Sequence, residues 1–117
     1  MIPPEWLPYH RDDDSELLGY LVPDHEERYV PVTVFGYQLD DAADEYDAGQ
    51  VLENIDLSYL ADTWLLSIQD REDPINVQIV EASPERLRVK SVDYGWEKDY
   101  GTLIDLPVPE QGRLLRR

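Results

Sequence analysis

The sequence contains no cysteine, and it has one methionine, one phenylalanine and only two lysines among its 117 residues. Without cysteine the chain cannot form a disulfide, use a thiolate nucleophile or hold zinc or an iron–sulfur cluster through thiolates. It also lacks the run of about 18 apolar residues that a transmembrane helix needs. Residues 1–6 show no basic region followed by an apolar run, so we expect no secretory signal and a cytoplasmic location.

The motifs of known catalytic and metal sites are lacking too. The two histidines, His10 and His25, belong to no H-E-x-x-H pattern, and neither a G-x-S-x-G motif nor a glycine-rich phosphate loop is present. The acidic run at residues 12–16 lacks the glycine and the distal glutamate of a calcium loop. We therefore expect a non-enzymatic protein without a cofactor or metal, and a carboxylate-based hydrolase is the less favoured alternative.

Acidic residues dominate the charge of the chain. It has 26 aspartates and glutamates against 10 lysines and arginines, which gives a net charge of −16. This charge repels nucleic acid phosphates and anionic membranes, so we expect neither direct nucleic acid binding nor membrane binding. It favours a cationic partner, divalent ions or no partner at all. Adaptation to a salt-rich cytoplasm or a GC-rich genome would explain the charge equally well.

The pattern of apolar residues predicts strands over most of the chain. Stretches rich in β-branched and aromatic residues, several of them alternating apolar with polar side chains, predict strands at 6–11, 16–22, 29–37, 63–69, 75–81, 86–92 and 102–108. Short turns join the later strands, which favours an antiparallel meander.

One segment, residues 40–54, has the pattern of a helix. Asp40 or Asp41 is the expected cap, and Ala48 and Leu52 belong to an apolar stripe that Tyr46 would extend. We thus expect an α+β fold, with about six strands in a strongly bent antiparallel sheet or partly open barrel and one main helix. The chain would be a single domain, residues 1–117, with flexible tails at 1–5 and 110–117.

Three cations, Arg86, Arg88 and Lys90, alternate along the predicted strand 86–92 and therefore share one face. In an acidic protein such a stripe is expected to pair with carboxylates on neighbouring strands. The alternative is an anion-binding site, which the net negative charge opposes at long range.

The densest group of aromatic and acidic residues is the segment VDYGWEKDYGT, residues 92–102. It lies between two predicted strands, where Gly95 and Gly101 can supply the positive φ of a hairpin loop. If exposed, its aromatic and acidic side chains would suit a cationic group or a peptide, and the candidate binding residues are Tyr94, Trp96, Glu97, Asp99 and Tyr100. The alternative is that these aromatics pack within the fold.

Four segments together carry a resemblance: GYLVP (19–23), VPVTVFGYQL (30–39), YLADTWLL (59–66) and VQIVEASPERLRVK (77–90). Their order resembles that of small acidic bacterial proteins of no assigned function. The resemblance covers most of the chain and implies a single compact domain, without implying an activity.

Two hypotheses about function follow from these observations. The first is an interaction module that binds a protein partner, such as a basic one, or a second copy of itself. The second is an acidic mimic of DNA that occupies the groove of a basic nucleic-acid-binding protein, which requires carboxylates spaced like phosphates on an elongated surface.

Overall fold

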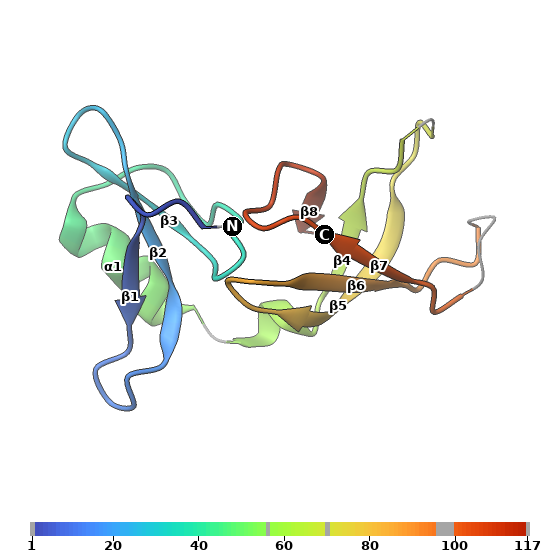
Figure 1. Cartoon of the computed structure of the whole chain (residues 1–117), viewed down its shortest axis with the longest axis horizontal. Coiled ribbons are helices and arrows are strands. Elements are labelled where there is room, and N and C mark those ends of the chain that lie inside the picture. The colour runs from blue at the N-terminus through green and yellow to red at the C-terminus, as the bar shows by residue number, and fades with distance from the viewer. Residues whose placement is uncertain (1, 56, 70, 96–99, 117) are drawn as a thin grey trace.

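The computed structural model describes residues 2–55, 57–69, 71–95 and 100–116. These residues form eight strands, one α-helix and one short 3-10 helix, arranged as two antiparallel sheets (Figure 1). The α+β fold class is confirmed. The strands are divided between a small and a large sheet, and neither sheet is closed into a barrel by the strands described.

The small sheet has the order β1-β2-β3, with β1 at Leu7–His10, β2 at Leu17–Pro23 and β3 at Tyr29–Val32. The carboxylate of Asp24 closes the β2–β3 turn because it accepts hydrogen bonds from the amides of Glu26 and Arg28. Strand β3 is shorter than predicted. After it the chain turns, with the Tyr37 amide donating to the Thr33 hydroxyl and Gly36 at a φ of +92°.

Helix α1, Glu45–Asn54, packs on this small sheet (Figure 1). Its cap is Asp44, whose carboxylate accepts a hydrogen bond of 2.8 Å from the Asp47 amide. The prediction of Asp40 or Asp41 as the cap was therefore wrong by one turn. An aspartate at any of these positions can cap a helix. The Tyr29–Ala43 bridge binds the segment before the helix to β3 in an extended conformation, and the helix therefore begins after that segment.

The buried face of α1 is narrower than predicted. Ala48, Gly49 and Leu52 face the small sheet, where Leu18 and Leu21 complete a small apolar core. Tyr46, which was expected to extend this stripe, is 73% exposed. It precedes Ala48 by two positions, which places its side chain on the opposite side of the helix.

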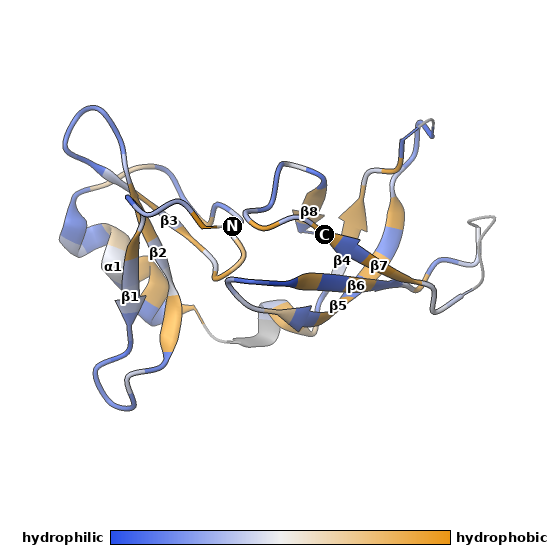
Figure 2. Cartoon of the chain, viewed as in Figure 1, coloured by the Kyte–Doolittle hydropathy of each residue, from blue (hydrophilic) through white to orange (hydrophobic). Residues whose placement is uncertain are grey.

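The large sheet follows a 3-10 helix at Leu57–Leu60 and has the order β7-β6-β5-β4-β8. Its strands are β4 (Thr63–Leu66), β5 (Ile75–Ala82), β6 (Leu87–Ser91), β7 (Leu103–Leu106) and β8 (Leu114–Arg116). Strands β4 to β7 form the predicted meander. Alternate residues of β4, β5 and β6 are buried in the main core, namely Trp64, Leu66, Ile75, Val77, Leu87 and Val89. Figure 2 shows hydrophobic and hydrophilic positions following one another along these strands.

Strand β8 corrects the prediction of a flexible tail at 110–117. It pairs with β4, Leu114 is buried, and the Arg116 guanidinium binds Asp62 at 2.8 Å. The carboxylate of Glu110 accepts hydrogen bonds from the amides of Arg113 and Leu114, which fixes the entry to the strand. At the other end of the chain Ile2, which belongs to the tail predicted at residues 1–5, packs against the main core.

The turn at residues 33–37 joins the two sheets. It inserts the fully buried Phe35 into the main core, where its ring meets the edge of Trp64 at a centroid distance of 6.1 Å. The Tyr37 ring contacts the same tryptophan at 4.8 Å. The Glu110 amide donates to the Phe35 carbonyl at 2.7 Å, so the segment before β8 holds the turn from the other side.

The two sheets lie one after the other along an elongated molecule, with extents of 45 × 31 × 23 Å. In the residues described, no helix has both the length and the apolar character that crossing a membrane requires.

Replacing Phe35 by alanine tests whether this insertion holds the fold together. We expect Phe35→Ala to lower the free energy of unfolding by about 3–5 kcal/mol, because it leaves a cavity in the main core. Leu115→Ala, at an exposed position of β8, is the control and should change stability by about 0.5 kcal/mol or less. Urea unfolding followed by tryptophan fluorescence measures both, and equal losses would contradict the assigned role of Phe35.

Candidate functional site

The predicted loop at 92–102 places two of its five candidate residues together. The rings of Tyr94 and Tyr100 are stacked at a centroid distance of 4.5 Å, and the side chains are 87% and 51% exposed. The other three candidates, Trp96, Glu97 and Asp99, lie outside the described residues. The structure therefore shows an exposed tyrosine pair, and binding at this loop stays a prediction.

Asp93 has a structural role in the same loop. Its carboxylate accepts hydrogen bonds from the Asn76 amide at 3.0 Å, the Asn76 side chain at 3.2 Å and the Gly95 amide at 2.8 Å. The two backbone hydrogen bonds are the main reason that the pKa of Asp93 lies below its ordinary value. The first aspartate of the repeated D-Y-G thus fastens the loop to β5.

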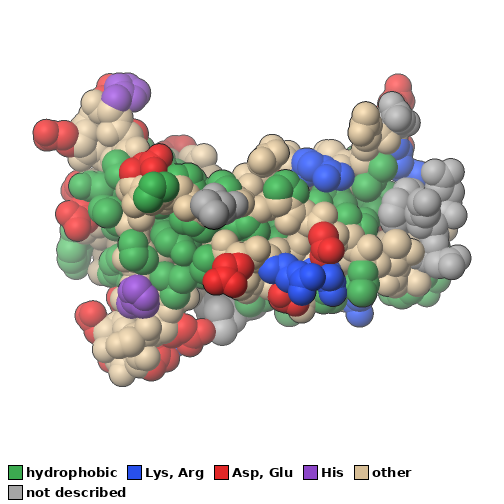
Figure 3. Space-filling view, in the orientation of Figure 1, with side chains coloured by type: hydrophobic (Ala, Val, Ile, Leu, Met, Phe, Trp, Pro, Cys, Tyr) green, Lys and Arg blue, Asp and Glu red, His purple; other side chains and the backbone are tan. Residues whose placement is uncertain are grey.

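The cationic stripe on β6 forms cross-strand ion pairs at two of its three positions. Arg88 binds Asp105 on β7 through two hydrogen bonds of 2.6 and 3.3 Å, and Arg86 lies 3.9 Å from Glu81 on β5. On the face that Figure 3 shows, blue Lys and Arg side chains lie beside red Asp and Glu side chains over the large sheet. Lys90 stands opposite Gln78 and Leu103. The geometry supports the pairing hypothesis, since both arginines already have carboxylate partners and an anion would have to displace them.

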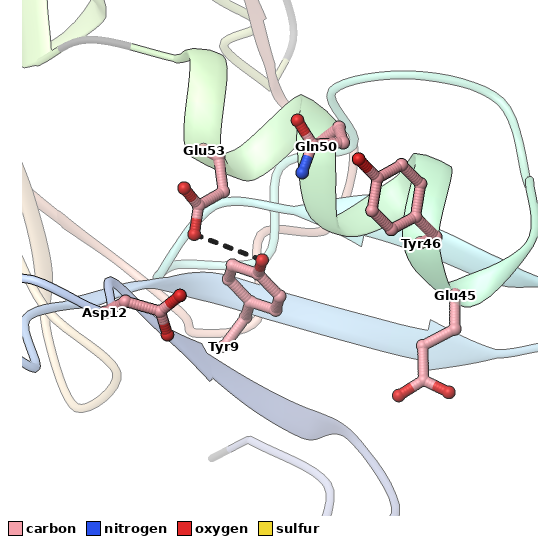
Figure 4. Close-up of a pocket in the computed structure, with 6 residues that line it drawn as sticks. All are labelled: Tyr9, Asp12, Glu45, Tyr46, Gln50 and Glu53. Atoms are coloured by element: carbon pink, nitrogen blue, oxygen red, sulfur yellow. Dashed lines mark hydrogen bonds between the residues drawn. The ribbon is translucent and has the colours of Figure 1, made fainter.

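An open hollow lies between β1 and α1, and we call it the β1–α1 hollow. It has a volume of about 550 Å³ and is lined by Tyr9, Asp12, Glu45, Tyr46, Gln50 and Glu53. Figure 4 shows Tyr9 on the strand below the helix, with Tyr46 and Gln50 above it and Asp12 and Glu45 at the two sides.

One wall of the hollow depends on a glycine in the helix. A Cβ at position 49 would lie 2.8 Å from Cε2 of Tyr9, so Gly49 makes room for the tyrosine ring against α1. The Tyr9 hydroxyl then donates a hydrogen bond of 3.1 Å to a carboxylate oxygen of Glu53 (Figure 4). The close approach of β1 therefore explains why a glycine, which weakens a helix, occupies position 49.

The electrostatics of the hollow favour positive charge. Burial and the hydrogen bond to Glu53 raise the pKa of the Tyr9 hydroxyl, so this group stays a neutral hydrogen-bond donor and does not become a nucleophile at neutral pH. Among the described arginines and lysines, none forms an ion pair with Asp12, Glu45 or Glu53. No three acidic or histidine side chains of the described chain are arranged to hold a metal ion.

Sequence analysis did not find this hollow. Its residues span positions 9 to 53, and two strands with their connecting segments separate its two walls, so no local motif marks it. The sequence did indicate one wall of the hollow. Helical spacing places Tyr46, Gln50 and Glu53 on one face of α1. This shared face was not recognised because Tyr46 was assigned to the buried stripe of the helix.

The charge of the chain is unevenly divided between the two sheets. Residues 1–60, which hold the small sheet and α1, include 15 of the 26 acidic residues but only two of the ten basic ones, Arg11 and Arg28. The remaining residues hold the other 11 acidic and eight basic residues, so the charge is −13 in the first part and −3 in the second. The hollow therefore lies at an acidic end of the molecule.

Comparisons of the chain with protein-family models, with curated proteins and with solved structures give no match. The resemblance to small acidic bacterial proteins accordingly stays a prediction.

Replacing Asp93 by alanine tests its structural part. An acid with a lowered folded pKa contributes stability that is complete above its unfolded pKa of about 3.9 and is lost as the pH falls through the folded value. We expect Asp93→Ala to lower the free energy of unfolding by about 1–2 kcal/mol at neutral pH, and the difference from the unmodified chain to shrink below about pH 4. Urea unfolding at several pH values measures this.

The control for that change is Glu85→Ala, on the exposed turn before β6, which should have little effect at any pH. A difference between Asp93→Ala and the unmodified chain that is the same at pH 7 and pH 3 would contradict the role given to the carboxylate.

The contact between Gly49 and Tyr9 can be tested by a double-mutant cycle. In the Tyr9→Ala background, Gly49→Ala should stabilise the chain by about 1 kcal/mol, because alanine favours a helix. In the unmodified chain the new methyl group meets the Tyr9 ring, so the gain should be absent or reversed. Thermal unfolding of the four variants measures the coupling, and an equal gain in both backgrounds would show that the ring does not lie against the glycine.

Proposed function

We propose that the protein is a non-enzymatic interaction module whose acidic end, formed by the small sheet and α1, binds a basic partner protein. The observation that carries this proposal is the concentration of unneutralised carboxylates at that end. Net charge alone affects mainly solubility. A charge concentrated on one part of the surface steers an oppositely charged partner toward it and contributes to specificity.

The ion pairs of the described residues support this division. Four arginines pair with carboxylates, and three of these pairs, which involve Arg86, Arg88 and Arg116, lie on the large sheet. At the acidic end one arginine pair is formed, between Arg11 and Asp14. The large sheet therefore neutralises much of its charge internally, while most acidic side chains of the other end keep their charge available to a partner.

The mimicry of DNA is the second candidate, and the long axis of 45 Å favours it. A mimic needs carboxylates distributed along that axis in the way that phosphates follow a duplex. Because the charge is gathered at one end, an interaction module with a local basic partner is the better supported of the two. Pairing of two copies through the acidic end would bring like charges together and is disfavoured for the same reason.

The proposal can be tested with a nona-lysine peptide as a basic probe. We expect Glu16→Gln combined with Glu27→Gln, in the two loops of the small sheet, to weaken binding roughly two- to fivefold, and raising sodium chloride from about 50 to about 500 mM to weaken it further. Isothermal titration calorimetry measures the affinity.

The matched control is Glu72→Gln combined with Glu85→Gln, which removes the same charge from exposed turns of the large sheet. This pair should change the affinity less than the first pair does. Equal losses from the two double variants, or no binding by the unmodified chain at low salt, would refute an acidic binding end.

A further inference from the structure

We infer that the β1–α1 hollow receives an arginine side chain of the basic partner. This inference rests on the proposed function, and it adds the chemical group that the site recognises and the residues that recognise it. The aromatic walls of the hollow, the arrangement of its carboxylates and its size all favour this group.

The aromatic walls come first, because two tyrosine rings face the same space from different elements. Tyr46 keeps 73% of its surface exposed although it lies beside a concavity, and Tyr9 is held opposite it by its contact with Gly49 and its hydrogen bond to Glu53. The faces of tyrosine rings attract cations electrostatically. The two rings therefore offer aromatic surface to a cationic group that enters the hollow.

The carboxylates restrict which cation fits. Asp12 comes from the turn after β1, whereas Glu45 and Glu53 come from the first and last turns of α1, so they border the hollow at separate points (Figure 4). Since no three acidic side chains of the described residues converge on one point, a metal ion lacks its ligand set. An extended organic cation can instead reach more than one carboxylate.

Among the cationic side chains, arginine matches both features. Its guanidinium is planar, is weakly hydrated, stacks on aromatic rings and donates hydrogen bonds in several directions. The ammonium of lysine is compact and strongly hydrated, and it gains less from a ring face. A hollow of about 550 Å³ is large enough for a side chain that enters from a partner surface.

The exposed tyrosine pair at 94 and 100 provides an internal comparison. Tyr94 is at least as exposed as Tyr46, yet its ring already stacks on Tyr100 and it belongs to the less acidic part of the chain. Tyr46→Ala and Tyr94→Ala thus remove the same side chain from two exposed positions. Of the two tyrosines, Tyr46 lines the hollow and Tyr94 does not.

The test compares nona-arginine with nona-lysine peptides by calorimetry at constant salt. The unmodified chain should bind nona-arginine more tightly. Tyr46→Ala should weaken nona-arginine binding about three- to tenfold and change nona-lysine binding less than about twofold, whereas Tyr46→Phe, which keeps the ring, should retain the preference. Tyr94→Ala, which tests the separate binding loop predicted at residues 92–102, should reduce nona-arginine binding clearly less than Tyr46→Ala does, and thermal unfolding confirms that each variant is folded.

The inference is overturned if Tyr46→Ala weakens both peptides equally or neither, or if Tyr94→Ala reduces nona-arginine binding as strongly as Tyr46→Ala does. In these cases a dependence on Glu16 and Glu27 would still support the acidic end as a binding surface. Absence of binding by both peptides would remove the proposed function and the inference together.

Discussion

The contact between Phe35 and Trp64 is the interaction on which the arrangement of the two sheets depends. A three-stranded sheet with one helix has a small core of its own, and it is attached to the larger core through the short turn that carries Phe35. The indole nitrogen of Trp64, on β4, donates to the Tyr59 carbonyl at 2.9 Å, so the 3-10 helix before the large sheet holds the tryptophan in place. Gly36 is required beside it, because a Cβ there would lie 2.7 Å from that of Pro109.

This attachment separates two kinds of surface. Three arginines of the large sheet, Arg86, Arg88 and Arg116, form ion pairs with carboxylates of the same part of the molecule, which is a structural use of charge. The small sheet and its helix hold most of the remaining carboxylates together with the β1–α1 hollow. The proposed binding surface and the main hydrophobic core therefore belong to different parts of the molecule, and a change in one need not disturb the other.

The sequence was sufficient to predict the fold class, the single helix, the β4–β7 meander and the pairing of Arg86 and Arg88. It did not predict the division into two sheets, because alternation with a period of two is the same in either sheet. It missed β8 because three residues are too short a pattern, and the partner of Arg116, Asp62, is distant in sequence. The hollow escaped prediction for a related reason, since β1 and α1 meet only in the folded chain.

The uneven distribution of charge affects how the molecule orients itself as it diffuses toward a partner. An elongated body with −13 of its −16 charges in one half behaves as an electric dipole as well as a net anion. The field of a basic surface exerts a torque on such a body and turns its acidic half forward during diffusion. The hollow would then arrive already oriented, and fewer collisions would be lost to unproductive orientations.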